Sequence, residues 1–187
     1  MGRDKALLPH PAGGTWLEHT LAQLAVLQAP ITVLSRHGAH RELAEAWARR
    51  QGLVLEAIAE PPPWEGPLLA LQRLSARYPA NRLLICPVDM PGLNSAALET
   101  LLAAAAQQAG LIHVAHDGER LQPPLALLPA SDGWRLKLDQ AIARGERRWQ
   151  GWLLRFQFRS VALDPQAIGN INAPEELPTS GFARSVS

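Results

Sequence analysis

The sequence of 187 residues lacks several features that define special classes of protein. It contains a single cysteine, Cys86, which excludes an internal disulfide and suits a reducing compartment. Charge of neither sign is in excess, because the formal net charge is +1, and this balance predicts no nucleic-acid partner. No apolar run approaches the roughly 18 residues of a membrane span, and MGRDK at the start leads into no signal-peptide core. We therefore expect a cytoplasmic protein without membrane contacts.

The sequence does contain an alternation of two hydrophobic periods. Apolar residues spaced as on a helix alternate with short apolar runs that are typical of buried strands. We expect helices at 15–28, 41–51, 67–78 and 94–108, and strands at 29–35, 53–58, 81–86 and 111–116. Strands that alternate with helices of this length predict crossover connections on a mostly parallel sheet, and therefore an α/β fold.

The rhythm changes after residue 116. The Asp-Gly pair at 117–118 predicts a turn into an antiparallel strand at 124–128, placed at an edge of the sheet or in an excursion from it. Two further helices are expected at 132–144 and 146–154, and a strand at 156–163. We expect one domain over residues 1–177 and a disordered tail over 178–187.

The loops that follow the strands are the first places to look for a site, because ligands of open parallel sheets bind beyond the carboxyl ends of the strands. Asp89 lies just past the strand at 81–86, between two prolines. A carboxylate there can hold Mg²⁺ against substrate phosphates, although it can also simply cap the next turn. Gly66 and Pro67 open the helix at 67–78, whose N-terminus is either an anion site or a plain helix start.

Six motifs occur in the same order and at similar spacing as in the molybdenum cofactor guanylyltransferases. They are MGRDKALL, EGPLLAL, CPVDMPGL, HDGER followed by PPLALL, GERRW and NINAPEEL. The sequence resembles this family from residue 1 to about 177. The resemblance implies a Rossmann-like, three-layer nucleotidyltransferase fold with helices on both faces of the sheet. It also implies transfer of GMP from GTP to molybdopterin-bound molybdenum, with Mg²⁺ as the metal ion.

The resemblance further implies that the chain lacks the first strand of the family. In the family that strand leads into a glycine-rich loop that wraps the nucleotide, and Met1, Gly2, Asp4 and Lys5 match only the end of this loop. Gly2, Asp4 and Lys5 are therefore expected to contact the nucleotide. We expect that Met1 is an internal methionine taken as the start, or that the gene has lost its front, so that the central strand and half of the nucleotide cradle are missing.

The resemblance assigns roles to individual residues. Lys5 is expected to pair with the nucleotide phosphates, and Asp89 is expected to ligate Mg²⁺. Asn170 and Asn172 match an Asn-x-Asn-x-Pro-Glu loop that is expected to orient the phosphates or the incoming cofactor. The alternative for Asn172 is a turn or the cap of a last helix.

The two substrates imply further contacts. Glu60 lies near the position of a family aspartate on the guanine side, and Gly66 lies beside the nucleotide crevice. The terminal phosphate on the pterin of the second substrate requires a basic, hydrogen-bonding surface. The candidates for this surface are His116, Asp117, Arg120, Arg147 and Arg148. The alternative for the last two is a solvated helix face.

Three hypotheses for the function stay open. The first is a Mg²⁺-dependent guanylyltransferase, and the second is a related nucleotidyltransferase that uses CTP. The third is a non-catalytic homologue that binds molybdopterin or a partner enzyme. The sequence shows no convincing Ser-His-Asp or Cys-His set, as expected for a transfer that needs no nucleophile from the protein. Family members are expected to contact a molybdoenzyme or a chaperone, but no patch of the sequence identifies one.

Overall fold

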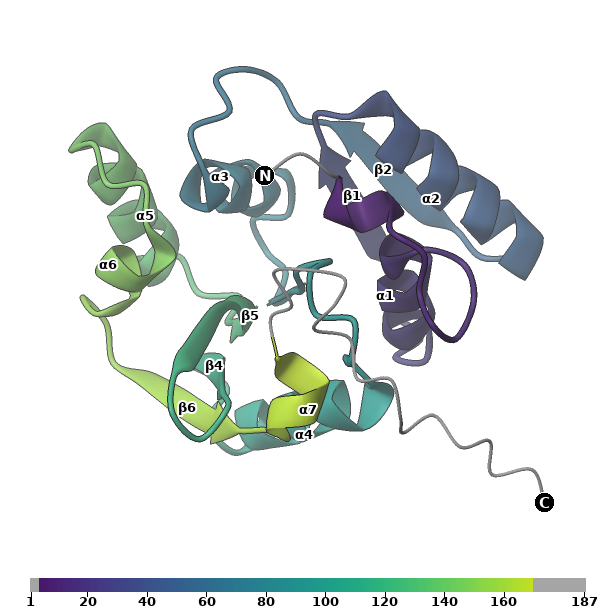
Figure 1. The fold of residues 1–187 in the computed structure, drawn as a ribbon. Coiled ribbons are helices and arrows are strands. Elements are labelled where there is room, and N and C mark those ends of the chain that lie inside the picture. The colour runs from purple at the N-terminus through teal and green to yellow at the C-terminus, as the bar shows by residue number, and fades with distance from the viewer. Residues whose placement is uncertain (1–3, 170–187) are drawn as a thin grey trace.

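The computed structural model describes residues 4–169 (Figure 1). A short 3-10 helix, η1 (Lys5–Leu7), opens this part of the chain. Seven helices follow: α1 (Trp16–Ala25), α2 (Gly38–Gln51), α3 (Pro67–Arg77), α4 (Ser95–Gln107), α5 (Gly133–Ala143), α6 (Trp149–Leu153) and α7 (Pro165–Ile168). The six strands are β1 (Ile31–Ser35), β2 (Leu55–Ala59), β3 (Leu83–Ile85), β4 (Ile112–His116), β5 (Leu121–Leu128) and β6 (Phe158–Ala162).

The predicted alternation of helices and strands is confirmed. Every element that the hydrophobic pattern predicts is present, with ends that differ by at most three residues. The pattern predicts neither η1 nor α7, which are only three and four residues long. The longest helix in residues 4–169 is α2 with 14 residues, and no helix of this part of the chain is long and apolar enough to cross a membrane.

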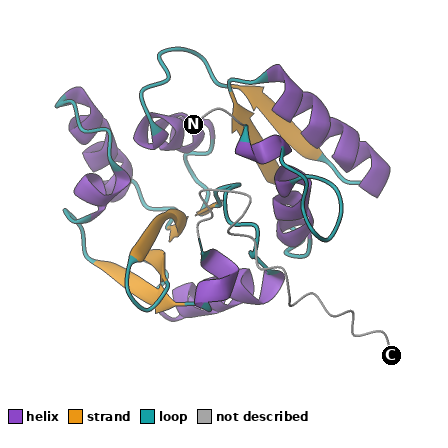
Figure 2. Cartoon of the chain, viewed as in Figure 1, coloured by secondary structure: helices purple, strands orange, loops and turns teal. Residues whose placement is uncertain are grey.

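The strands form two hydrogen-bonded groups (Figure 2). In the first, β1 and β2 are parallel, with Ile31 opposite Leu55 and Ser35 opposite Ala59. The second has the order β3-β5-β4-β6, in which β5 is antiparallel to both of its neighbours and β4 is parallel to β6. The four-stranded group is therefore a mixed sheet, with both parallel and antiparallel pairs.

Strand β5 lies inside its sheet, not at an edge. The expectation of an edge or an excursion is thus wrong, and the sequence of β5 shows the physical reason. Leu125 and Leu127 pack into one hydrophobic cluster with α4 and α7, whereas Ala126 and Leu128 pack into another with α3, α5 and α6. A strand that is apolar on both faces is most stable between two layers of helices. This packing confirms the predicted three-layer arrangement of helices on both faces.

The tryptophans are mostly core residues. Trp16, Trp47 and Trp134 are buried on α1, α2 and α5, and Trp149 and Trp152 are buried on α6. The ring of Trp152 meets that of Trp134 edge to face, with centroids 6.2 Å apart. All five contribute apolar area to the core, so they are not available to stack on a ligand.

A cavity separates the two groups of strands. Within residues 4–169, β1 is hydrogen-bonded to β2 and β3 is hydrogen-bonded to β5, and neither strand is paired on its other side. Residues of both strands line a cavity of about 450 Å³ between them. Its remaining walls are mostly apolar and come from α1, α3, α4, β5 and the loops that lead into β1 and β3, with Leu24, Leu74 and Leu102 on the three helices.

Candidate active site at the carboxyl ends of the strands

Lys5 and Asp89, predicted to hold the nucleotide phosphates and Mg²⁺, lie side by side. Lys5 begins η1, and Asp89 lies in the loop after β3. The Nζ of Lys5 donates to Oδ2 of Asp89 over 3.5 Å, and each side chain keeps 30% of its surface exposed. An ion pair of this exposure contributes at most about 1 kcal/mol. Phosphate oxygens can therefore replace Asp89 as the partner of Lys5, and a cation can replace Lys5 as the partner of Asp89, at a small cost in free energy.

Asp4 fastens the Lys5 turn to the end of β1. Its Oδ1 caps η1 by accepting the backbone N–H of Ala6. Its Oδ2 lies 2.6 Å from Nε2 of His40, and Nδ1 of His40 lies 2.9 Å from Oγ of Ser35. Because a carboxylate only accepts, Nε2 donates to it, and in the neutral ring Nδ1 then accepts from the hydroxyl. This chain of hydrogen bonds links η1, α2 and β1.

No motif in the sequence predicts this Ser-His-Asp chain, and its geometry indicates an anchoring role. Ser35 is buried, with 9% of its surface exposed, and its Oγ also accepts the backbone N–H of His37. The hydroxyl is thus engaged by two partners inside the protein. This arrangement suits a fastening for Asp4 better than a nucleophile that must reach a substrate.

Two histidines fasten the loop that carries Asp89. Nε2 of His10 lies 2.8 Å from the carbonyl of Pro91, and Nε2 of His19 lies 2.7 Å from the carbonyl of Leu93. The two rings stack with their centroids 3.9 Å apart. Burial lowers the pKa of His19, partly opposed by the Leu93 carbonyl, and the nearby His10 lowers it further. The sequence does not reveal the role of either histidine, since their partners lie more than 70 residues away.

Gly92 permits a close approach within the same loop. A Cβ atom at this position would lie 2.1 Å from the backbone carbonyl oxygen of Gln166 in α7. A side chain here therefore cannot be accommodated unless one of the two backbones moves. The absence of a side chain at Gly92 thus allows the loop of Asp89 to pack closely against α7.

Glu60 and Gly66 border the loop between β2 and α3. The carboxylate of Glu60 accepts from Arg73 at 2.5 Å, and both side chains are mostly buried. Gly66 has a φ of +99°, where a side chain would be strained, and it precedes Pro67 at the first position of α3. The predicted nucleotide contacts of both residues remain predictions.

Asp117 and Arg120 lie in the turn between β4 and β5, and His116 is the last residue of β4. Oδ1 of Asp117 accepts the backbone N–H groups of Arg120 and Glu119, and Oδ2 accepts from Gln122. The two backbone donors, then Gln122, hold the pKa of Asp117 at about 2. Asp117 therefore shapes this turn, and the predicted role of the turn in binding the pterin phosphate stays a prediction.

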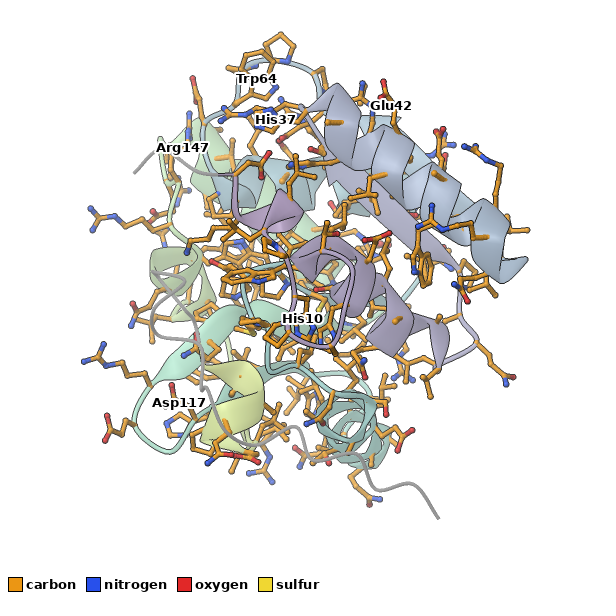
Figure 3. The ribbon with its side chains drawn as sticks, turned by 45° about the vertical axis from the view of Figure 1, so that its right-hand side comes forward. His10, His37, Glu42, Trp64, Asp117 and Arg147 are labelled. Atoms are coloured by element: carbon orange, nitrogen blue, oxygen red, sulfur yellow. The ribbon has the colours of Figure 1, made fainter. Side chains whose placement is uncertain are left out.

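Arg147 and Arg148 line a cavity of about 530 Å³ at the start of α6. The guanidinium of Arg147 is paired with Glu65, with its Nη2 2.6 Å from the carboxylate, and Figure 3 shows it on the outside of the molecule. The pair joins the loop before α3 to the loop before α6. Both arginines remain candidates for the second substrate. The predicted contacts of Gly2, Asn170 and Asn172 fall outside the described residues.

The metal chemistry of the site rests on one described carboxylate. In residues 4–169 no group of three or more His, Cys, Asp or Glu residues could hold a metal ion. Asp89 with substrate phosphates fits Mg²⁺, which commonly binds through one or two carboxylates and phosphate oxygens. Burial, and next the charge of Asp89, raise the pKa of Cys86 to about 12, so this thiol is a poor ligand and a poor nucleophile.

The fold and the position of this site define an α/β nucleotidyltransferase-like protein. Molybdopterin-guanine dinucleotide biosynthesis protein A from Archaeoglobus fulgidus superposes with a TM-score of 0.66 at 18% identity, covering 93% of this chain and 87% of that one. 4-Diphosphocytidyl-2C-methyl-D-erythritol synthase from Anaerococcus prevotii gives a TM-score of 0.72 at 12% identity, covering 92% and 90% of the two chains. Similarities at this identity show a shared fold.

The chain belongs to the family of MobA-like NTP transferase domains, whose family model matches residues 1–157. A probable molybdenum cofactor guanylyltransferase of Rhodopirellula baltica is 32% identical over 185 residues, which cover 95% of this chain and 83% of that protein. A molybdenum cofactor guanylyltransferase of Shewanella sp. strain MR-4 is 34% identical over 113 residues, covering 59% of this chain and 56% of that protein. The predicted family membership is confirmed.

Proposed function

We propose that this chain transfers GMP from GTP to molybdopterin-bound molybdenum cofactor and releases pyrophosphate. The names of the relatives in Rhodopirellula and Shewanella support this reaction. The observation that carries the proposal is the contact between Lys5 and Asp89, because it brings a cation and a carboxylate to the carboxyl ends of the strands from positions 84 residues apart. A triphosphate with its divalent cation needs both charges in one place.

Each residue then has a defined task. Lys5 donates to phosphate oxygens of GTP and offsets their charge. Asp89 holds Mg²⁺, which when bound offsets charge on the leaving pyrophosphate. A phosphate oxygen of the cofactor attacks the α-phosphorus of GTP, and the bond between the α-phosphorus and the bridging oxygen to the β-phosphorus breaks. Positioning and electrostatics suffice for this exchange, so no covalent intermediate with the protein is needed.

The fold by itself does not select the nucleotide. A synthase with a diphosphocytidyl name shares the architecture, so CTP is the second candidate. GTP is favoured because the relatives above 30% identity are guanylyltransferases by name. A non-catalytic homologue is less well supported, since Lys5 and Asp89 are both present and in contact.

The cavity between β1 and β3 bears on activity. A strand placed there would find hydrogen-bonding groups on both neighbours and apolar walls around it. It would also end near Asp4 and Lys5, which lie where β1 and β3 end. We propose that full activity requires an additional strand in this cavity. Adding an apolar five-residue strand ahead of Met1 should raise GTP affinity, whereas the same extension with a central proline should not.

The proposed function is tested by titrating the chain with Mg-GTP and Mg-CTP in a calorimeter and by assaying GMP transfer. Asp89→Asn should lower the transfer rate about 100-fold or more, in line with the loss of a main electrostatic contact to the reacting phosphates. Glu45→Gln, at an exposed position of α2, is the matched control and should behave as the unaltered chain. Tighter binding of CTP than GTP would favour the second candidate, and an Asp89→Asn variant with unaltered turnover would refute the role of Asp89.

A further inference from the structure

One tryptophan is exposed. Trp64 has 51% of its surface in contact with solvent, whereas the other five tryptophans are at most 6% exposed. It lies in the loop between β2 and α3, beyond the carboxyl end of β2 (Figure 3). This is the same edge of the fold at which β1 ends and Asp4 is fastened. A large exposed indole at a ligand-binding edge is a candidate contact for a substrate.

Hydrogen bonds fix the position of the indole ring. Its Nε1 donates to the backbone carbonyl of Glu60 over 3.0 Å. The side chain of Glu60 is paired with Arg73, and a second nitrogen of Arg73 donates to the carbonyl of Pro63 at 2.9 Å. Pro63, which precedes the tryptophan, and Glu60, whose carbonyl accepts from its ring, both accept hydrogen bonds from Arg73 of α3. A ring held in this way loses little conformational entropy when a ligand stacks on it.

The ring of Trp64 is in contact with a cationic side chain. The guanidinium of Arg36, which directly follows β1, lies over Trp64 with its carbon 5.6 Å from the ring centroid. Nε of Arg36 donates to Nε2 of His37 at 3.0 Å, which orients the guanidinium. Indole and guanidinium are both flat, and both stack on aromatic heterocycles. Two loops at the ends of adjacent parallel strands therefore bring a guanidinium and an exposed indole together.

We propose that Trp64 and Arg36 form a stacking platform for the planar nitrogen heterocycle of a substrate. The inference rests on the proposed function, in which both substrates carry such a ring: guanine in GTP and the pterin in the cofactor. Stacking leaves the edge of the heterocycle open to hydrogen bonds, so the platform would add affinity for the ring while Lys5 and Asp89 act on the phosphates. Trp64 is in this view a residue for substrate affinity and selection, without a part in the bond exchange.

The exposed position of Trp64 provides its own assay. Iodide should quench mainly this tryptophan, since the others are buried. Saturating GTP or a soluble pterin, such as pterin-6-carboxylate, should lower quenching by iodide, and pyrophosphate, which has no ring, should not. Whichever ring protects Trp64 identifies the occupant of the platform. Trp64→Leu should weaken binding of that ligand about 5- to 150-fold, while Trp64→Phe retains most of the affinity.

A control variant separates this proposal from a general surface effect. Val54→Ala alters a side chain that is 93% exposed ahead of β2, at its opposite end, and should leave both affinities unchanged. If GTP binds in the calorimeter but neither ring protects Trp64 and Trp64→Leu binds normally, the platform is refuted while the guanylyltransferase proposal stands. If neither GTP nor the pterin binds the unaltered chain, both proposals fail.

Discussion

The contact of Gly92 with α7 allows a quantitative prediction. A Cβ atom on Gly92 would lie 2.1 Å from the carbonyl oxygen of Gln166, well inside the 3.0 Å below which Cβ contacts are essentially never observed. The gap of 0.9 Å (3.0 Å − 2.1 Å) must be opened by movement of backbone, because no flexible side chain is involved. Overpacking of this kind costs about 1–3 kcal/mol. For a chain of this size that cost lowers the melting temperature by about 2–12 °C.

Gly92→Ala should also disturb the site, because Asp89 belongs to the same loop. A displacement of about 1 Å at a reacting centre can reduce turnover about 100-fold. Urea denaturation measures the first effect, and GMP transfer measures the second. Gly110→Ala is the matched control, since a Cβ atom there would meet nothing within 4 Å. Equal unfolding midpoints for the two variants would show that the loop of Asp89 is not held against α7 in the way the structure indicates.

Two further predictions follow from the ionisable groups. Burial lowers the pKa of His19 below its ordinary 6.5, so the unfolded chain binds this proton more tightly; stability from the neutral ring is therefore present above pH 6.5 and lost as the pH falls below it. His19→Gln should make the unfolding free energy, measured by denaturant titration, fall less steeply with pH below pH 6.5. Part of the pH dependence should remain, because burial also lowers the pKa of His113. A slope unchanged by His19→Gln would contradict this assignment. Burial raises the pKa of Cys86 from 9.0 to about 12, so this thiol should react with a thiol reagent at pH 8 much more slowly in the folded chain than after unfolding in urea. Equal rates in the two states would contradict the raised pKa.

Local signals in the sequence predict the helices and strands well. The sequence Gly66-Pro67 marks the start of α3, and Asn94 caps α4 by accepting the backbone N–H of Ala97. Such signals act within a few residues, so they can be read directly from the sequence. The position of β5 is a different matter, because strand order depends on which faces the helices cover.

The residues of the candidate site, too, can be predicted from the sequence only in part. The resemblance to the family identifies Lys5 and Asp89, and the structure places them in contact. It does not identify His40, His10 or His19, whose partners lie 36, 81 and 74 residues away. The sequence around a histidine does not indicate a hydrogen-bond partner that is distant along the chain. These anchoring residues can therefore be found only once the segments have been placed in space.

The two halves of the site are held by different means, and this difference gives them different sensitivities. The position of Asp4 depends on a chain of hydrogen bonds through His40, while Ala6 of η1 packs into a hydrophobic cluster. Asp89 depends on the hydrogen bonds of His10, which is buried, and His19, which is half-buried, and on backbone packing at Gly92. A polar chain costs about 1 kcal/mol per bond when broken, whereas a backbone clash moves the whole loop. Changes at His40 should therefore weaken nucleotide binding at little cost in stability, whereas changes at Gly92 should weaken both together.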